Sequence, residues 1–235
     1  MTGLRGVGKT VLLDRVRLDA EDSGIQTLRV EAPEDRSLPA ILLPELRQGL
    51  LRLSRSQKAK ALAERALRAL ASFAKVMKVK YDDIEVGLDF EPEAGLADNG
   101  DLEQDLQMLM EAVGQAAAKA ETAAVLFIDE VQYVREKELA ALITTLHRMA
   151  QRNLPVLMVG AGLPQIPGQM GNAKSYAERL FDFPVIAALS QDAAYQAIAR
   201  PIQAQDKEIL PDALELIYAK TRGYAYFLQE WGKHS

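Results

Sequence analysis

The chain has 235 residues, of which 49% are hydrophobic, and a formal net charge of −5 at pH 7. This length and apolar content are enough to bury one substantial core, and no apolar run approaches the roughly 20 residues that a membrane-spanning helix needs. The chain contains no cysteine and two histidines, which excludes disulfides, thiolate nucleophiles and cysteine-based metal sites. We therefore expect a globular protein of the cytoplasm, with no membrane partner.

Residues 3–10, Gly-Leu-Arg-Gly-Val-Gly-Lys-Thr, match the phosphate-binding pattern G-x-x-x-x-G-K-[ST]. Glycines let successive backbone N–H groups surround an anion, and the helix expected over 11–18 adds its positive end. We expect Lys9 to reach the β- and γ-phosphates and the Thr10 hydroxyl to bind Mg²⁺. The predicted nucleotide contacts in this segment are Gly3, Arg5, Gly6, Val7, Gly8, Lys9, Thr10 and Val11.

Only two residues precede this motif, whereas a phosphate-binding loop normally follows a buried strand. The sequence therefore predicts that the first strand of the fold is missing from this chain. We expect a fragment or a shortened gene model.

The next hundred residues combine one strand with several helices. Alternating apolar residues predict a strand over 26–30, and apolar residues at helical spacing predict helices over 39–53 and 58–76. The period changes over 76–90, which predicts a β-hairpin inserted between helices. A helix with an acidic first turn is expected over 101–120.

Charge is distributed unevenly over this part of the chain. Residues 45–80 contain ten Lys or Arg against two Glu, whereas residues 82–105 contain ten carboxylates and no Lys or Arg. The basic segment fits a surface that binds the phosphate backbone of DNA. It also fits a solvated helix face beside a complementary acidic segment, which is the commoner origin of such a block. Both interpretations stay open.

A continuous apolar run over 123–128 ends in Asp129 and Glu130, a pattern typical of a strand buried on both faces of a parallel sheet. Open α/β sheets bind their ligands at the carboxyl ends of the strands. We expect Asp129 to hold Mg²⁺, directly or through water, and Glu130 to polarise a water for attack on the γ-phosphate. Together with Lys9, the pair predicts a site that hydrolyses a nucleoside triphosphate.

The second half continues with a helix over 136–151, a strand over 154–159 and, after a loop rich in Gly and Pro, a short strand over 183–187. Only helical signals follow Ser190, which is a favourable helix cap.

These elements predict an α/β fold of the P-loop NTPase type: a parallel sheet flanked by helices, with an inserted β-hairpin and a small C-terminal helical lid. We expect the P-loop domain to span residues 1–187, with the basic helices and the hairpin inserted over about 45–100. The lid is expected over residues 188–235.

The glycine-rich loop, the apolar strand with Asp-Glu and the trailing lid together resemble the AAA+ ATPases. The stretches 159–164 (Val-Gly-Ala-Gly-Leu-Pro) and 173–181 (Ala-Lys-Ser-Tyr-Ala-Glu-Arg-Leu-Phe) are similar to bacterial members of the origin-recognition initiator (Orc/Cdc6-like) type. The likeness covers nearly the whole chain. It implies ATP and Mg²⁺ as cofactors, and a winged-helix DNA-binding domain beyond the lid, which these residues do not contain.

The resemblance also suggests roles for two arginines. Arg179, in its Arg-Leu-Phe context, matches the arginine that reaches a neighbouring subunit's nucleotide, which implies a homo-oligomer; a surface or ion-paired arginine is the equal alternative. The polar sensor of the family is absent at 160–162, and an aromatic occupies the place of the lid's sensor arginine, so that Arg222 is a weaker candidate for it. A site without its sensors should hydrolyse slowly and act as a nucleotide-gated switch.

Three functions follow from these residues. The first is an ATPase that couples its nucleotide state to a DNA or protein partner. The second is a non-hydrolysing, nucleotide-gated signalling or scaffold module, and the third is a fragment with impaired nucleotide binding. Turnover separates the first two, and nucleotide affinity separates both from the third.

Overall fold

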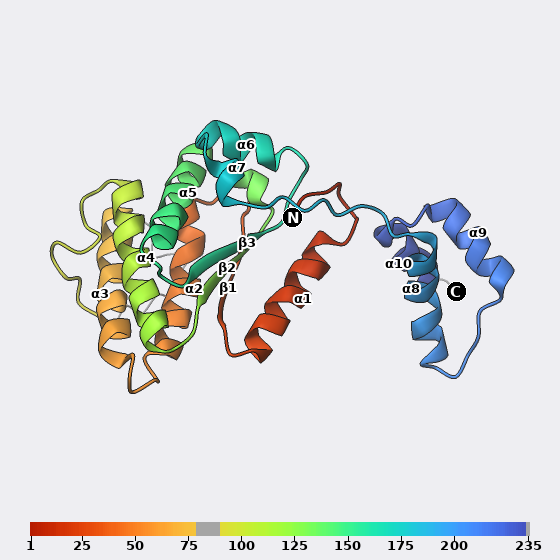
Figure 1. The fold of residues 1–235 in the computed structure, drawn as a ribbon, viewed down its shortest axis with the longest axis horizontal. Helices are drawn as coiled ribbons and strands as arrows, with labels where there is room; N and C mark the ends of the chain where they lie inside the picture. The colour runs from red at the N-terminus through yellow and green to blue at the C-terminus, as the bar shows by residue number, and fades with distance from the viewer. Residues whose placement is uncertain (79–89, 234–235) are drawn as a thin grey trace.

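The computed structural model describes residues 1–78 and 90–233. A parallel sheet of three strands in the order β1-β2-β3 lies at the centre of the helical layers (Figure 1). The strands are β1 (Gln26–Glu31), β2 (Ala124–Asp129) and β3 (Val156–Gly160). Glu31 lies opposite Asp129 in the register, so neighbouring strands end at the same edge of the sheet. The predicted α/β fold with a parallel sheet flanked by helices is confirmed.

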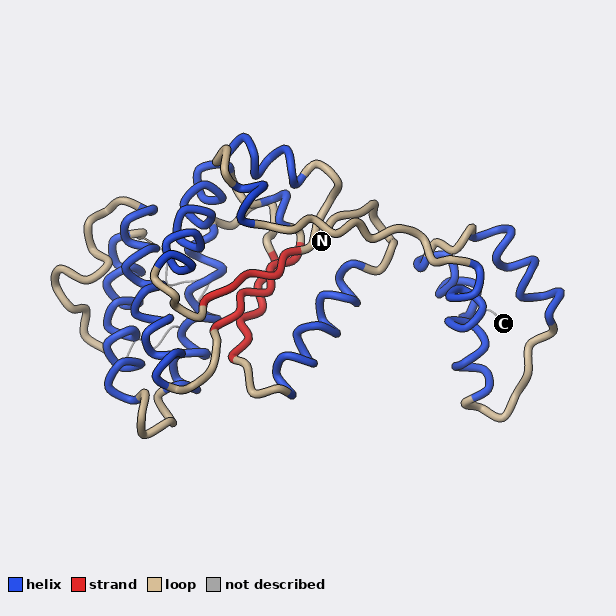
Figure 2. Tube along the Cα trace, viewed as in Figure 1, coloured by secondary structure: helices blue, strands red, loops and turns tan. Residues whose placement is uncertain are grey.

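Helices lie on both sides of this sheet (Figure 2). Helix α1 packs on one face, whereas α2, α4 and α5 pack on the other and α3 forms an outer layer against α2 and α4. Their bounds are α1 (Lys9–Asp22), α2 (Leu38–Leu53), α3 (Lys60–Val76), α4 (Leu102–Lys119) and α5 (Glu136–Gln151). The helices predicted in this part of the chain are therefore present, with ends shifted by at most a few residues.

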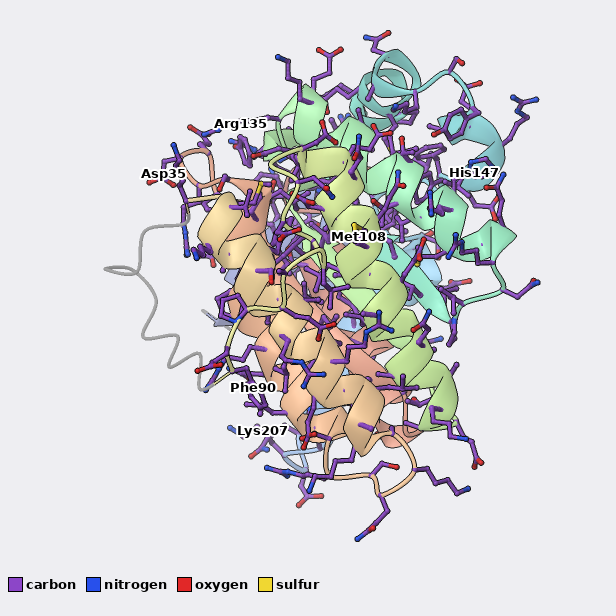
Figure 3. All side chains as sticks on the ribbon, turned by 90° about the vertical axis from the view of Figure 1, so that its left-hand side faces the viewer. Asp35, Phe90, Met108, Arg135, His147 and Lys207 are labelled. Atoms are coloured by element: carbon purple, nitrogen blue, oxygen red, sulfur yellow. The ribbon has the colours of Figure 1, made fainter. Side chains whose placement is uncertain are left out.

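The main hydrophobic core fills the space between the sheet and the layer of α2 to α5. Every residue of β2 is buried, as expected for a central strand with helices on both faces. Phe73 of α3 and Leu106 of α4 are fully buried in this core, and Figure 3 looks onto these two helices from outside, with Met108 of α4 on the near side. The layer of α2 to α5 thus packs against the sheet through one shared core.

Two predictions for residues 161–187 are wrong. The expected loop contains two helices, α6 (Ile166–Ala173) and α7 (Ala177–Leu180). Helix α6 carries a proline in its first turn, where the missing N–H costs no hydrogen bond. In place of the expected strand over 183–187 there is only an isolated bridge between Val185 and Thr2. Among the described residues, no second residue of this segment pairs with a strand. The predicted hairpin over 76–90 falls largely outside the described residues.

The last three helices form a separate small unit at the other end of the molecule (Figure 1). They are α8 (Gln191–Gln203), α9 (Pro211–Thr221) and α10 (Ala225–Lys233). Their own core contains Ala194, Ile198, Ile217 and Leu228. These helices occupy the place of the expected lid, although the domain boundary at residue 187 stays a prediction. Among the described residues, no helix has the length and apolar content to cross a membrane.

Candidate functional site

The phosphate-binding motif forms a glycine-rich turn that leads directly into α1. Gly6 and Gly8 have φ angles of 81° and 95°, a region that side-chain-bearing residues rarely adopt. Gly8 is the residue before α1, and the helix begins at Lys9. The sequence therefore folds as the motif requires, with a tight turn at the N-terminal end of a helix, where backbone N–H groups lack partners within the helix.

Lys9 lies across the inside of this turn. Its Nζ donates a hydrogen bond to the Leu4 carbonyl oxygen at 2.9 Å, and only 7% of the residue is exposed. Thr10 is exposed beside it. A cation at this position, held by one backbone carbonyl, is placed to exchange that carbonyl for an anion bound in the turn.

Residues 1–3 attach the turn to the sheet. The Thr2 N–H donates to the Pro184 carbonyl at 2.8 Å, and the Gly3 N–H donates to the Gly162 carbonyl at 3.2 Å. A Cβ atom at Gly3 would lie 2.3 Å from the Ile186 carbonyl oxygen, so glycine is required there. Residues 1–3 therefore lie between the end of β3 and residues 184–186, and they join the turn to both.

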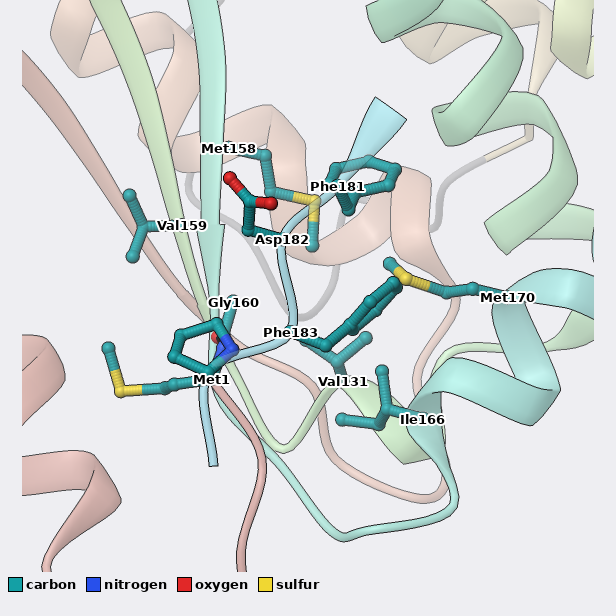
Figure 4. Close-up of a pocket in the computed structure, with 11 residues that line it drawn as sticks. Met1, Val131, Met158, Val159, Gly160, Ile166, Met170, Phe181, Asp182 and Phe183 are labelled. Carbon is teal, nitrogen blue, oxygen red and sulfur yellow. Dashed lines mark hydrogen bonds between the residues drawn. The ribbon is translucent and has the colours of Figure 1, made fainter. Parts of the chain in front are cut away.

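Beside this attachment is a mainly apolar cavity of about 210 Å³ between β3 and residues 181–184. Met1 lies at one side of it, with Met158 and Phe183 nearby (Figure 4). The Met1 ammonium donates to the Gly160 carbonyl at 2.6 Å, and burial lowers the pKa of this ammonium from its ordinary value of 8.0. The apolar lining does not suit a polyphosphate.

The acidic pair lies at the carboxyl end of β2, as predicted. Asp129 is the last residue of the strand and is only 7% exposed. Its Oδ1 accepts a hydrogen bond from the Glu130 N–H at 2.8 Å. Glu130 has φ 53° and ψ 41°, a left-handed conformation that is uncommon for residues other than glycine and that often marks functional sites.

A cavity of about 220 Å³ brings Glu130 together with the phosphate-binding turn and the lid. It is lined by Arg5, Gly6, Gly8, Lys9, Thr10, Val11, Glu130, Ala225, Tyr226 and Gln229. Gly3, Val7 and Asp129 lie outside this lining, Gly3 in the attachment to the sheet and Asp129 at the end of β2 behind Glu130. Seven of the predicted site residues thus meet in one cavity.

The N-terminal end of α10 closes one side of this cavity. The Tyr226 N–H donates to the Gly6 carbonyl at 3.0 Å, and a Cβ atom at Gly6 would lie 3.1 Å from the Tyr226 Cβ. The contact was not predictable because it depends on how the lid folds back onto the turn.

The two predicted arginines lie outside the cavity lining. Arg222 follows the end of α9 with a left-handed φ of 50° and is exposed. Arg179 lies in the short helix α7, where it is also exposed. Among the described residues of one chain, the cations that line the cavity are therefore Arg5 and Lys9.

Two further polar residues, not predicted from the sequence, lie beside the site, both in the short 3-10 helix η2 (Val131–Tyr133). The Gln132 side chain donates from Nε2 to Glu130 Oε2 and accepts at Oε1 from the Leu163 N–H at 3.1 Å. Tyr133 accepts a hydrogen bond from Arg5 Nη2 at 3.0 Å. The only signal in the sequence was their position directly after Asp-Glu, which does not reveal the tight turn that brings them back to the site.

Several side chains of the basic segment 45–80 are engaged within the chain. Arg52 donates to the Thr27 carbonyl at 2.9 Å, and Arg68 pairs with Glu93 at 2.8 Å. Lys58 pairs with Glu121 at 2.8 Å, and this hydrogen bond lowers the pKa of the Glu121 carboxyl. Arg55, Arg65 and Lys75 are exposed. The intramolecular pairs agree with the interpretation of the segment as a solvated, charge-compensated surface.

A comparison with curated proteins gives no match to this chain. The model of a protein family described as "AAA ATPase domain" matches residues 1–159, about two thirds of the chain. The matched part contains the phosphate-binding turn, the strand β2 and the acidic pair. The chain therefore belongs to the AAA ATPase family.

Proposed function

We propose that this chain binds Mg-ATP in the cavity beside the phosphate-binding turn, hydrolyses it slowly, and couples the nucleotide state to a partner. The observation that carries this proposal is the shared cavity, in which Lys9, Thr10 and Glu130 lie beside the end of α10. Three separate stretches of the sequence meet there: residues 5–11 supply the anion-binding turn with its lysine, Glu130 supplies a carboxylate, and residues 225–229 of α10 form a wall.

The residues fit ATP and Mg²⁺ in their chemistry. The turn carries glycines at positive φ and a lysine held by a single carbonyl, which suits a phosphate group. Mg²⁺ uses few protein ligands and keeps waters and phosphate oxygens, so we assign it to the Thr10 hydroxyl and to Asp129, which would hold it directly or through a water. When bound, Mg²⁺ would neutralise phosphate charge.

Hydrolysis is assigned to Glu130. Glu130 takes a proton from the attacking water, whose oxygen bonds to the γ-phosphorus as the bond to the β–γ bridging oxygen breaks. Lys9 offsets charge on the phosphates during this step.

The rate is expected to be low in an isolated chain. An arginine that stabilises the transition state contributes roughly 10³- to 10⁵-fold in related enzymes, and neither Arg179 nor Arg222 lines the cavity. The exposed Arg179 would serve a neighbouring copy, so we propose that self-association raises turnover. If hydrolysis is absent, the same cavity supports the alternative function of a nucleotide-gated switch.

The proposal also includes the partner of the chain. The likeness to origin-recognition initiators suggests DNA as the partner, reached through the exposed cations of residues 45–80. A DNA contact predicts binding that falls steeply with salt and weakens when Arg65 and Lys75 become Glu. Because Arg68 is paired with Glu93, its substitution would also disturb the fold and is the less informative variant.

Calorimetric titration with Mg-ATP tests the nucleotide proposal. Lys9→Ala should weaken binding by roughly 10- to 100-fold, because one charge-assisted contact is lost. Lys137→Ala, on an exposed position of α5, is the matched control and should bind as the original chain does. Glu130→Gln should keep its affinity and lose roughly 10²- to 10⁴-fold in turnover. Equal affinity in Lys9→Ala and the control would reject this site.

A further inference from the structure

Gln132 lies between two parts of the site that are distant in sequence. Its Nε2 donates to Glu130 Oε2, and its Oε1 accepts from the Leu163 N–H at 3.1 Å. Glu130 lines the cavity, whereas Gln132 lies behind it, outside the lining. Its side chain therefore contacts the carboxylate without occupying the space of a ligand.

The amide of Gln132 has a defined orientation. A backbone N–H is only a donor, so the group that faces Leu163 must be the amide oxygen, and the NH₂ group must face Glu130. The amide fits because residue 162 is a glycine: a Cβ atom there would lie 2.4 Å from Gln132 Oε1. The local sequence thus fixes a donor against one oxygen of the Glu130 carboxylate.

The same turn holds the phosphate-binding loop. Gly162 accepts from the Gly3 N–H at 3.2 Å, and its own N–H donates to the Met1 carbonyl at 3.2 Å. Gly162 and Leu163 are adjacent, so one short stretch of backbone anchors both the stem of the loop and, through Gln132, the carboxylate. This stretch therefore links Glu130, through Gln132, to the stem of the phosphate-binding turn.

We infer that Gln132 is a positioning residue for Glu130: it holds Oε2 of the carboxylate and leaves Oε1 free to accept the proton of the attacking water. This inference rests on the proposed hydrolysis. It also explains how the site works with an apolar stretch at 160–162, because the polar group at that turn comes from η2 instead.

The test uses Gln132→Leu, which removes both amide groups, and Gln132→Glu, which keeps an acceptor for Leu163 but removes the donor to Glu130. Single-turnover hydrolysis should fall roughly 10- to 100-fold in both, as for other residues that orient a reacting group. The Kd for Mg-ATP should stay within about twofold, because binding depends on the turn. Gln151→Leu, at an exposed position at the end of α5, is the matched control.

A role through Glu130 also predicts strong non-additivity. In a Glu130→Gln background, adding Gln132→Leu should cause almost no further loss of turnover, because the carboxylate that Gln132 holds is already gone. A simple effect on folding would instead add to the loss and would weaken Mg-ATP binding in both backgrounds.

The outcomes separate the two ideas. If Gln132→Leu and Gln132→Glu hydrolyse ATP as fast as the original chain, the positioning role is overturned and the proposed ATPase stands. The same holds if the losses of turnover are additive in the double variant. Binding of Mg-ATP without turnover in the original chain would reject the hydrolysis itself, and the positioning role with it.

Discussion

Replacing Gly162 with alanine tests whether the backbone turn at the end of β3 organises the site. A Cβ atom there would lie 2.3 Å from Ile166 Cδ1 and 2.4 Å from Gln132 Oε1, whereas the nearest backbone atom, the Val131 nitrogen, would lie 3.3 Å away. The two closest atoms are ends of side chains, so they move rather than the backbone. Overpacking of this kind costs about 1–3 kcal/mol, and the displaced Gln132 loses its hold on Glu130.

At a cost of about 2 kcal/mol, the midpoint of thermal unfolding should fall by roughly 4–8 °C for a chain of this size. Turnover of ATP should fall further than stability alone explains, because the protein remains folded at 25 °C. Gly168→Ala is the matched control: it lies in α6 with no atom within 4 Å of the added Cβ, so stability should be equal or higher by up to about 1 kcal/mol. The reasoning is refuted if Gly162→Ala unfolds at the original temperature and keeps full turnover, or if the control loses as much.

Three further changes test the fold around the site. Phe73→Ala should lower the free energy of unfolding by about 3–5 kcal/mol in urea denaturation, because the ring is fully buried in the main core; a loss below about 1 kcal/mol would contradict that packing. Asp101→Ala should cost about 0.5–2 kcal/mol in the same measurement, because its Oδ1 caps α4 by accepting from the Gln104 N–H at 2.8 Å, whereas Asp101→Asn should retain most of this. The Thr27 hydroxyl donates a hydrogen bond to the Glu21 carboxylate and lowers the pKa of Glu21 from 4.5, an effect larger than the opposing effect of burial. This contact therefore stabilises the fold above pH 4.5, and its stabilisation is lost as the pH falls through the lowered pKa of the folded protein. Thr27→Val should therefore raise the pKa of Glu21 measured by NMR. Below pH 4.5 the free energy of unfolding should decrease less in this variant than in the original chain, by about a few tenths of a kcal/mol because the carboxylate is largely exposed. An unchanged pKa would reject the contact.

The fold was predictable from the sequence where periodicity and burial agree. The run over 124–128 is apolar because both faces of the strand are covered, and α5 begins and ends where the pattern places it. The wrong predictions concern the expected strand over 183–187, which forms only one bridge, and residues 166–180, whose Gly and Pro content hides two short helices. Proline in the first turn is favourable for a helix, but a composition rich in glycine and proline is also typical of loops, so tertiary packing decides between them.

The site was predictable only for residues whose role follows from local chemistry. The phosphate-binding turn and the acidic pair could be located, because glycine conformations and the end of a buried strand leave marks in the sequence. Gln132 and Tyr226 could not, since their contacts join positions 31 and 220 residues away in the chain, to Leu163 and Gly6. Such contacts are made by the folded chain and have no local pattern.

Three sets of hydrogen bonds hold the phosphate-binding turn, and they differ in how easily they break. Gly3 is fixed by backbone bonds to the end of β3, and Arg5 is tied to Tyr133 by one exposed side-chain bond. Gly6 is held by a single bond from Tyr226 in the lid. Residues of α10 line the same cavity as the turn, so on binding of a phosphate we expect the bond from Tyr226 to adjust, whereas the bonds to the sheet keep the turn in place. Nucleotide binding would then change the position of the lid before that of the sheet. A switch that acts on a partner requires such a difference between the two states.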